Sequence, residues 1–241
     1  MPNTAPHSAS PRRSAAAPRP HEWPSLDAPV LQGQALFRQI LGCMAEPGTF
    51  AQMSVAPLPA GVALSPAAWA ALLVLCDLET GVWIANALDR DGLAEAIAFH
   101  TGARIVERAD QADFALIAPS TKTLPAFAEG SDTYPDRSTT LIVVVDTLEA
   151  PGEVSSSCHD RWRLSGPGIL EHRVIALDAS ARVLMERLAA NRASFPLGVD
   201  ALVTSNERLI ALPRSTRIEV QRPPLDTPTT ALEEVPDVRS R

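Results

Sequence analysis

Lysine is almost absent from this sequence, which has 20 arginines and a single lysine, Lys122, among its 241 residues. A pyridoxal-phosphate enzyme needs a lysine ε-amine to form its Schiff base, and Lys122 lies in the loop-like segment APSTKTLPAF. Pyridoxal catalysis is therefore not expected. Positive charge is also scarce, since the formal net charge is −7. Broad binding to nucleic acid or to an anionic membrane would need a positive field, so neither is expected.

Cysteines are few and long apolar runs are missing. Cys43, Cys76 and Cys158 are odd in number and form no CxxC pair, so neither a disulfide framework nor a cysteine-based zinc site is expected. The apolar run at 67–76 is half as long as the ~20 residues that a membrane-spanning helix needs. The basic N-terminus lacks the apolar stretch of a secretory signal. We therefore expect reduced thiols and a cytoplasmic protein.

The common local motifs of catalysis are absent as well. The sequence contains no GxGxxG, no GxxxxGK[ST] and no GxSxG, and we interpret Gly166-Pro167-Gly168 as a tight turn. The histidines of the central region, at 100, 159 and 172, lack the close spacing of a helical metal clamp. We expect no metal, and structural roles for these histidines. Local sequence thus indicates no self-sufficient catalytic site.

Proline is concentrated at the two ends of the chain, where ten of the 22 prolines lie. Residues 1–25 contain six Pro, four Ser and five Ala, and residues 223–241 are Pro-rich and acidic. Such segments bury too little apolar surface to offset the entropy of ordering them. We therefore predict two disordered tails around a single α/β domain over 26–222.

Within 26–222, helical and strand patterns first alternate and then give way to closely spaced strands. Helices are expected over 36–44, 66–77, 89–102 and 182–193. Ser65 and Pro66 are expected to open the second, and the third is expected to run from a cap at Asp89 to a left-handed cap at Gly102. Strands are expected over 82–86, 113–118, 141–145, 161–166, 201–205, 208–213 and 217–220. The continuous apolar strands require helices on both faces of the sheet, so the predicted fold is a three-layer α/β/α sandwich with a mixed sheet.

The last strands, 208–213 and 217–220, are short, apolar and expected to be joined by hairpins at the end of the sheet order. Unpaired backbone groups at such an edge invite another chain. We therefore expect a homodimer of the isolated protein that covers this edge.

Several polar residues are candidates for binding an anion or another ligand. Arginine forks suit carboxylates and phosphates, and Arg38, Arg137, Arg214 and Arg217 each lie beside turn residues. The segment Tyr134-Pro135-Asp136-Arg137-Ser138 leads into a central strand, and α/β proteins place ligands at strand ends. The alternative is a structural turn with an internal Asp136–Arg137 charge pair, and the residues alone favour it.

Seven strings together resemble one family: FRQILGCMAEPG (37–48), LLVLCDLETGVWI (72–84), FHTGA (99–103), YPDRSTTLIVVV (134–145), LSGPGI (164–169), FPLGVD (195–200) and LPRSTRIEV (212–220). They are similar to the PhnH family, the H subunits of bacterial carbon–phosphorus lyase core complexes. The strings occur in family order across nearly the whole central domain. The tails depart from the more compact family members, so nothing is carried over to them.

The resemblance implies a fold similar to pyridoxal-phosphate-dependent transferases without the cofactor. It also implies assembly with the G, I and J subunits. In phosphonate degradation by this family's complexes, an alkylphosphonate is transferred to C1′ of the ATP ribose and adenine is released. Three cysteines are too few for a four-cysteine iron–sulfur cluster, which agrees with radical chemistry residing in the J subunit.

Two hypotheses follow from the resemblance. In the first, the chain is an architectural subunit that dimerises and docks on its partners, with no cofactor. In the second, it binds nucleotide or phosphonate and contributes residues to catalysis. The candidates for that second role are Arg38, His100, Tyr134, Asp136, Arg137 and Arg214.

Overall fold

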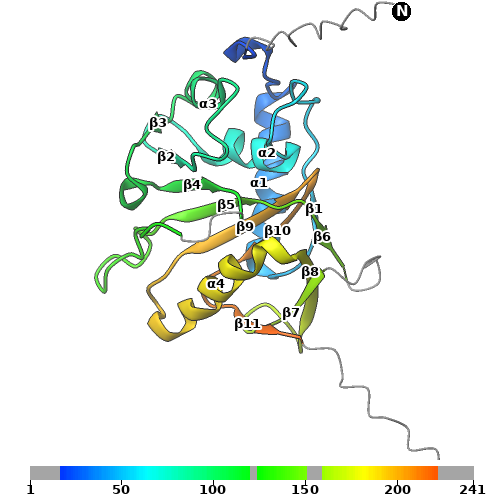
Figure 1. Cartoon of the computed structure of the whole chain (residues 1–241), viewed down its shortest axis with the longest axis vertical. Helices are drawn as coiled ribbons and strands as arrows, with labels where there is room; N and C mark the ends of the chain where they lie inside the picture. The colour runs from blue at the N-terminus through cyan, green and yellow to red at the C-terminus, as the bar shows by residue number, and fades with distance from the viewer. Residues whose placement is uncertain (1–16, 120–123, 151–158, 222–241) are drawn as a thin grey trace, which may run out of the picture.

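The structure is a computed structural model that describes residues 17–119, 124–150 and 159–221 (Figure 1). Its helices are α1 (Pro29–Ala45), α2 (Pro66–Leu75), α3 (Leu93–Thr101) and α4 (Arg182–Ser194), and its 3-10 turns are η1 (Pro20–Glu22), η2 (Ala109–Gln111) and η3 (Ala179–Ala181). Its strands are β1 (Ala51–Gln52), β2 (Gly81–Ile84), β3 (Arg104–Ile105), β4 (Phe114–Ile117), β5 (Thr140–Val144), β6 (Leu148–Glu149), β7 (His159–Ser165), β8 (Arg173–Asp178), β9 (Asp200–Ser205), β10 (Arg208–Leu212) and β11 (Arg217–Val220).

The main sheet has seven strands in the order β1-β10-β9-β5-β4-β2-β3. From β3 to β9 the neighbouring strands are parallel, whereas β10 and β1 pair antiparallel. The expected mixed sheet is confirmed. Its central strands β4 and β5 have apolar side chains on both faces, which is why they read as continuous apolar runs.

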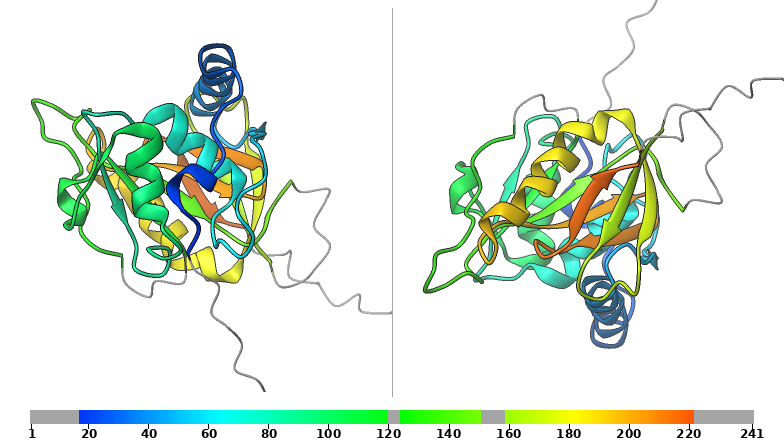
Figure 2. Two further views of the ribbon diagram at one scale, coloured as in Figure 1. Left: turned by 90° about the horizontal axis from the view of Figure 1, so that it is seen from above. Right: turned by 90° about the horizontal axis from the view of Figure 1, so that it is seen from below.

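A second, smaller sheet was not expected. It contains four antiparallel strands in the order β11-β7-β8-β6, and we call it the small sheet. Together with α4 it covers one face of the main sheet, while α1, α2 and α3 cover the other. Figure 2 shows α1 and α4 on opposite sides of the molecule. The fold is therefore α/β, but one outer layer combines a helix with a sheet instead of being helical throughout.

Two apolar cores result from this layering. The first joins the helices α1 to α3 to one face of the main sheet and contains Trp69 and Leu116. The second joins α4 and the small sheet to the other face and contains Ile117, Leu141 and Trp162. Successive residues Leu116 and Ile117 of β4 enter different cores, because side chains alternate along a strand.

Local signals place several helix ends. The Ser65 hydroxyl caps α2 by accepting a hydrogen bond of 3.1 Å from the Ala68 amide, as the Ser65-Pro66 pair predicts. Gly102 ends α3 with a left-handed φ of 76°, also as predicted. The start of α3 differs from prediction, since Gly92 rather than Asp89 occupies the cap position.

The segment just before residue 26 packs on the domain, unlike the tail that composition predicts for 1–25. Trp23 is only 2% exposed, and its ring lies 4.9 Å from that of Trp69. The Trp69 indole also donates a 2.8 Å hydrogen bond to the Pro24 carbonyl. The burial of Trp23 offsets the entropy cost of ordering this Pro- and Ala-rich segment, because an aromatic side chain buries a large apolar area. Residues 1–16 and 222–241 lie outside the described residues.

The C-terminal strands differ from the predicted run of hairpins. The β9–β10 hairpin forms through Asn206, which adopts a positive φ of 49°. Strand β11, however, leaves the main sheet and pairs with β7 in the small sheet. Strand β10 is covered by β1, so the expected open edge at 208–213 is wrong. The edge at 217–220 is open on one side, since β11 ends the order of the small sheet.

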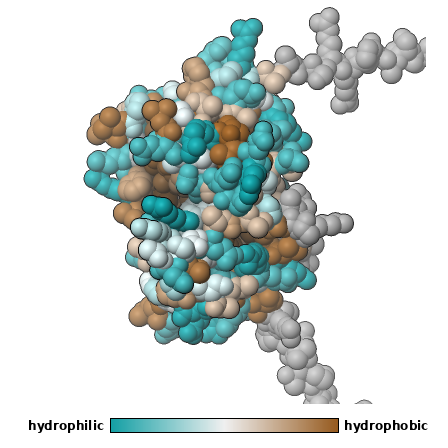
Figure 3. All heavy atoms as spheres, turned by 90° about the vertical axis from the view of Figure 1, so that its left-hand side faces the viewer, coloured by the Kyte–Doolittle hydropathy of each residue, from teal (hydrophilic) through white to brown (hydrophobic). Residues whose placement is uncertain are grey.

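Among the described residues, none of the helices has both the length and the apolar character to cross a bilayer. Figure 3 shows hydrophobic residues in separate patches among hydrophilic ones on the face that carries α3 and β3. Exposed apolar residues on and beside these elements include Leu78, Phe99 and Ile105.

Candidate functional site

Arg214 is the centre of the most densely connected polar cluster. It follows β10 and forms a paired contact with Asp200, Nε to Oδ1 at 3.2 Å and Nη2 to Oδ2 at 2.6 Å. Its Nη1 donates to the carbonyls of Pro135, at 2.6 Å, and Pro196, at 3.5 Å. Its Nη2 also donates to the Ser138 hydroxyl. All five guanidinium donors therefore have acceptors within the protein.

The Arg214 cluster holds the loop at 134–138, which contains three other candidate ligand-binding residues. The loop closes on itself through the Arg137 amide, which donates to the Tyr134 carbonyl at 3.2 Å. The Arg137 guanidinium lies 4.3 Å from the centre of the Tyr134 ring, a cation–π contact. Tyr134, Asp136 and Arg137 are exposed, so they are the part of the cluster that a ligand or partner can reach.

Glycine permits the tight start of this loop. Gly130 has a φ of 83°, and a Cβ there would lie 2.6 Å from the Pro135 carbonyl oxygen. Any other residue would be strained in this conformation and would push the loop away. The backbone therefore fixes where Tyr134 to Ser138 lie, and Arg214 holds the same stretch through the Pro135 carbonyl and the Ser138 hydroxyl.

The cluster lies at the amino ends of the parallel strands. Thr140, which begins β5, is in register with Asp200, which begins β9. Open α/β sheets bind ligands at the carboxyl ends of their strands. The position of the 134–138 loop at a strand end therefore does not indicate a ligand site, because the loop enters its strand rather than leaving it.

The remaining two candidates lie elsewhere. Arg38 is exposed on α1. His100, on α3, has its Nε2 at 3.0 Å from the Pro20 carbonyl oxygen, and its ring makes edge contacts with Trp69 and Phe99. His100 thus helps to hold the N-terminal segment on the domain. The structure brings together Tyr134, Asp136, Arg137 and Arg214, but not Arg38 or His100.

Two turns that sequence reasoning treated separately are packed together. The turn after α1 and the Gly166–Gly168 turn meet so closely that a Cβ at Gly168 would lie 1.9 Å from the Ala45 carbonyl oxygen. Arg173 joins them by donating to the Pro47 carbonyl at 2.8 Å and to the Glu46 carboxylate at 3.1 Å. No spacing rule links positions more than a hundred residues apart, so the sequence alone could not reveal this contact.

Two cavities lie away from the Arg214 cluster. One of about 300 Å³ lies between α1 and the 49–52 stretch, and one of about 230 Å³ lies on the other side of that stretch. Cys43 lines the larger cavity, and burial raises the pKa of its thiol. Burial also raises the pKa of Cys76 to about 12. Both thiols therefore remain protonated at neutral pH and are poor nucleophiles or metal ligands.

No group of three or more His, Cys, Asp or Glu side chains suited to a metal ion occurs in the described part of the chain. Lys122 and Cys158 lie outside the described residues. The Arg214 cluster is built for hydrogen bonding within the protein, and its exposed members lie in the 134–137 loop.

Comparison with known proteins identifies the family. The model of the family described as "Bacterial phosphonate metabolism protein (PhnH)" matches residues 24–219, which is nearly the whole folded domain. The chain belongs to the PhnH family. The match begins at residue 24, next to the buried Trp23 that anchors the N-terminal segment.

Two curated PhnH-like relatives agree with this assignment. The chain is 38% identical over 193 residues to the "Alpha-D-ribose 1-methylphosphonate 5-triphosphate synthase subunit PhnH" of Rhizobium meliloti (strain 1021), covering 79% of this chain and 92% of that protein. It is 30% identical over 213 residues to the "Putative C-P lyase subunit protein HtxG" of Stutzerimonas stutzeri, covering 86% of this chain and 95% of that protein. The Arg214 cluster lies within the matched region, as do the turn after α1 and the Gly166–Gly168 turn that packs on it.

Proposed function

We propose that this chain is a subunit of a carbon–phosphorus lyase complex, the complex that makes α-D-ribose 1-methylphosphonate 5-triphosphate in alkylphosphonate degradation. The observation that carries this proposal is the PhnH family match over residues 24–219, together with relatives named as subunits of such a complex. Its partners are the G, I and J subunits, and its compartment is the cytoplasm.

The role within the complex is architectural. Arg214, the best-placed anion-binding candidate, has every guanidinium donor engaged inside the protein. The described thiols are buried, and burial raises the pKa of each. These groups hold the fold, and none offers an accessible nucleophile or base. The fold follows that of pyridoxal-phosphate-dependent transferases without their cofactor.

A second candidate function is ligand binding at the 134–137 loop. Tyr134, Asp136 and Arg137 are exposed, and they project from a loop clamped by Arg214. In this alternative the loop contacts nucleotide or phosphonate once the partners complete the site. Arg38 and His100 would not take part at the same place, because they lie on α1 and α3.

Adenine release tests the architectural role. The purified chain is incubated with ATP and methylphosphonate, alone and after assembly with the G, I and J subunits. We expect adenine from the assembled complex and none above background from the chain alone. Sustained adenine release by the isolated chain would contradict the proposal.

A Tyr134→Ala/Arg137→Ala variant separates the two candidate functions. These side chains are exposed, so the variant should fold and assemble normally. An architectural subunit predicts adenine release within about twofold of the wild-type complex. A large rise in KM for ATP or methylphosphonate with intact assembly would instead favour the ligand-binding alternative.

A further inference from the structure

The outward face of the small sheet carries a cluster of arginines. Arg161 and Arg163 on β7 are exposed, whereas Trp162 and Leu164 between and beyond them are 1% and 0% exposed. Side chains alternate along a strand, so both arginines point away from the core. Arg217, on the neighbouring β11, is also exposed.

Strand register brings these three arginines onto one surface, which we call the basic face. Arg217 is paired with Ser165, which lies two residues beyond Arg163 and so shares its face. Arg161 and Arg163 are about 7 Å apart along β7, and Arg217 lies diagonally about 7 Å from Arg163. Long guanidinium side chains at these spacings can contact one partner surface together.

The three charges of the basic face have no ion-pair partners within the described residues. None of Arg161, Arg163 and Arg217 makes an ion pair or side-chain hydrogen bond with another described residue. By contrast, Arg182 pairs with Asp160 on the same small sheet, Nη2 to Oδ1 at 2.6 Å. One carboxylate, that of Glu219, is exposed on the same face opposite Arg163, but it forms no ion pair with any of the three arginines, so the face carries three positive charges against one negative charge.

The shape of this face favours a macromolecule over a small ligand. Small-molecule sites are concave, and the two cavities at the 49–52 stretch include no residue of the basic face. The basic face also includes the half-buried Val174, which is paired with Arg163. Arginines beside apolar residues on an open sheet face are typical of protein interfaces.

We propose that the basic face docks an acidic protein surface on a partner subunit of the carbon–phosphorus lyase complex. This inference rests on the function proposed above. Charge complementarity selects an acidic partner, because opposite potentials accelerate association and reject like-charged surfaces. A nucleic acid or an anionic membrane is less suited, since the rest of this acidic chain would repel it.

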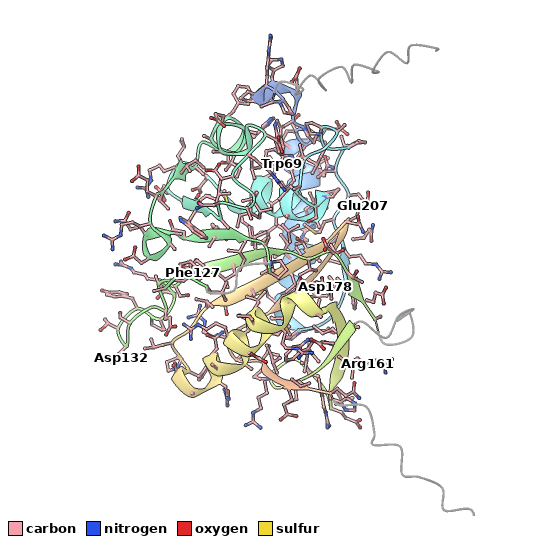
Figure 4. The ribbon with its side chains drawn as sticks, viewed as in Figure 1. Trp69, Phe127, Asp132, Arg161, Asp178 and Glu207 are labelled. Atoms are coloured by element: carbon pink, nitrogen blue, oxygen red, sulfur yellow. The ribbon has the colours of Figure 1, made fainter. Side chains whose placement is uncertain are left out.

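The β7 part of the basic face lies apart from the N-terminal anchor, whereas Arg217 of β11 is only three residues from Arg214. In Figure 4, Arg161 lies at the small-sheet end of the molecule, far from Trp69 of α2 and from Asp132 in the loop that precedes Tyr134. A variant at Arg161 and Arg163 removes no hydrogen bond of the Arg214 cluster or of the N-terminal anchor. Docking and ligand contact can thus be tested separately.

The test measures the association rate of the full-length chain with a preassembled complex of the G, I and J subunits. We expect Arg161→Glu/Arg163→Glu to slow association about tenfold or more at low salt. The difference should shrink as salt is raised, because exposed charges are screened. Glu219→Gln should accelerate association, since Glu219 lies opposite Arg163 on the same face and its removal makes that face more positive.

A matched control reverses two positive charges at a distant exposed site. Arg90 and Arg104 are exposed near α3 and β3, so Arg90→Glu/Arg104→Glu should stay within about twofold of wild type. A neutral variant, Arg161→Gln/Arg163→Gln, avoids a new repulsion with Glu219. It should still slow association, with a circular dichroism spectrum and melting temperature like those of wild type.

Each outcome supports or overturns the inference. If the wild-type chain associates with the complex and both basic-face variants associate at the same rate, the basic face is not the docking surface. The proposed function would still stand. Absence of wild-type association would overturn both. A third outcome is that the wild-type chain binds DNA or anionic vesicles through the basic face and fails to bind the subunit complex. That result would contradict an acidic protein as the partner.

Discussion

At the scale of single residues, Arg214 illustrates why a polar candidate can serve the fold. Its side chain and that of Asp200 are 14% and 16% exposed, and the guanidinium binds three separate segments of chain. A planar fork does this better than an ammonium group, because its five donors point in fixed directions. The sequence shows an arginine after a strand but cannot show that its acceptors are already present.

We therefore expect Arg214→Ala to lower the free energy of unfolding by about 3 kcal/mol, since it leaves Asp200 largely buried without its partner. Arg214→Lys should recover only part of this loss. Urea unfolding measures both, with Arg137→Ala as the exposed control, expected to change stability by less than about 0.5 kcal/mol. Wild-type stability of Arg214→Ala, combined with lost adenine release by the complex, would show that Arg214 acts on a ligand instead.

Cys76 makes stability depend on alkaline pH. Burial raises the pKa of its thiol from 9.0 to about 12, so the folded state keeps the proton that the unfolded state loses above pH 9. A pKa raised by folding gives stability that is present below pH 9 and lost as pH rises towards 12. We expect Cys76→Ala to reduce the loss of stability between pH 9 and pH 10 by up to about 1.4 kcal/mol.

Chemical unfolding at pH 7, 8, 9 and 10 measures this slope in wild type and variant. The two proteins should differ by a constant between pH 7 and pH 8, where the thiol is protonated in both states. Parallel curves through pH 10 would show that Cys76 ionises equally in the folded and unfolded chains.

At the scale of elements, strands and helices with strong local patterns were predictable, and their partners were not. Ser65-Pro66 marks the start of α2, and the apolar runs at β4 and β5 identify strands buried on both faces. Strand β11 has the same local pattern whether it pairs with β10 or β7. Proximity in sequence favours β10, but the partner is chosen by packing in the second core, which contains Ile218 and Leu164.

The N-terminal segment carries an element-scale prediction. Trp23 lies within a Pro-rich stretch but is 2% exposed against Trp69. We expect Trp23→Ala to lower the free energy of unfolding by about 3 kcal/mol, as for other large-to-small core changes. The control Leu31→Ala, at a position 74% exposed, should have little effect. Equal denaturant midpoints for Trp23→Ala and wild type would show that the segment does not contribute to the core.

The open edge of β11 carries a prediction about self-association. We expect the isolated protein to form a homodimer across this edge, because its backbone groups on one side have no strand partner among the described residues. Val220, which is 52% exposed, lies on that strand. Light scattering at micromolar concentration should give a dimer mass for wild type and a shift towards monomer for Val220→Lys. A monomer mass for the wild-type chain would contradict the prediction.

At the scale of the whole molecule, a family could be recognised from sequence, but the function of its candidate residues could not be assigned. The recognisable strings contain turns such as Glu46–Gly48 and Gly166–Gly168, which pack together and hold α1 against the small sheet. Much of what makes the family recognisable is therefore structural. The exposed residues that meet partners, such as those of the basic face, carry no local motif.

The most direct test of the account is an omission experiment on the reconstituted complex. Adenine release from ATP and methylphosphonate is measured for the G, I and J subunits with this chain, for the three without it, and for this chain alone. Our account predicts that adding the chain yields a stable four-subunit complex and restores activity that neither part has by itself. If the chain fails to co-purify with the three subunits and activity is the same without it, the central claim is wrong.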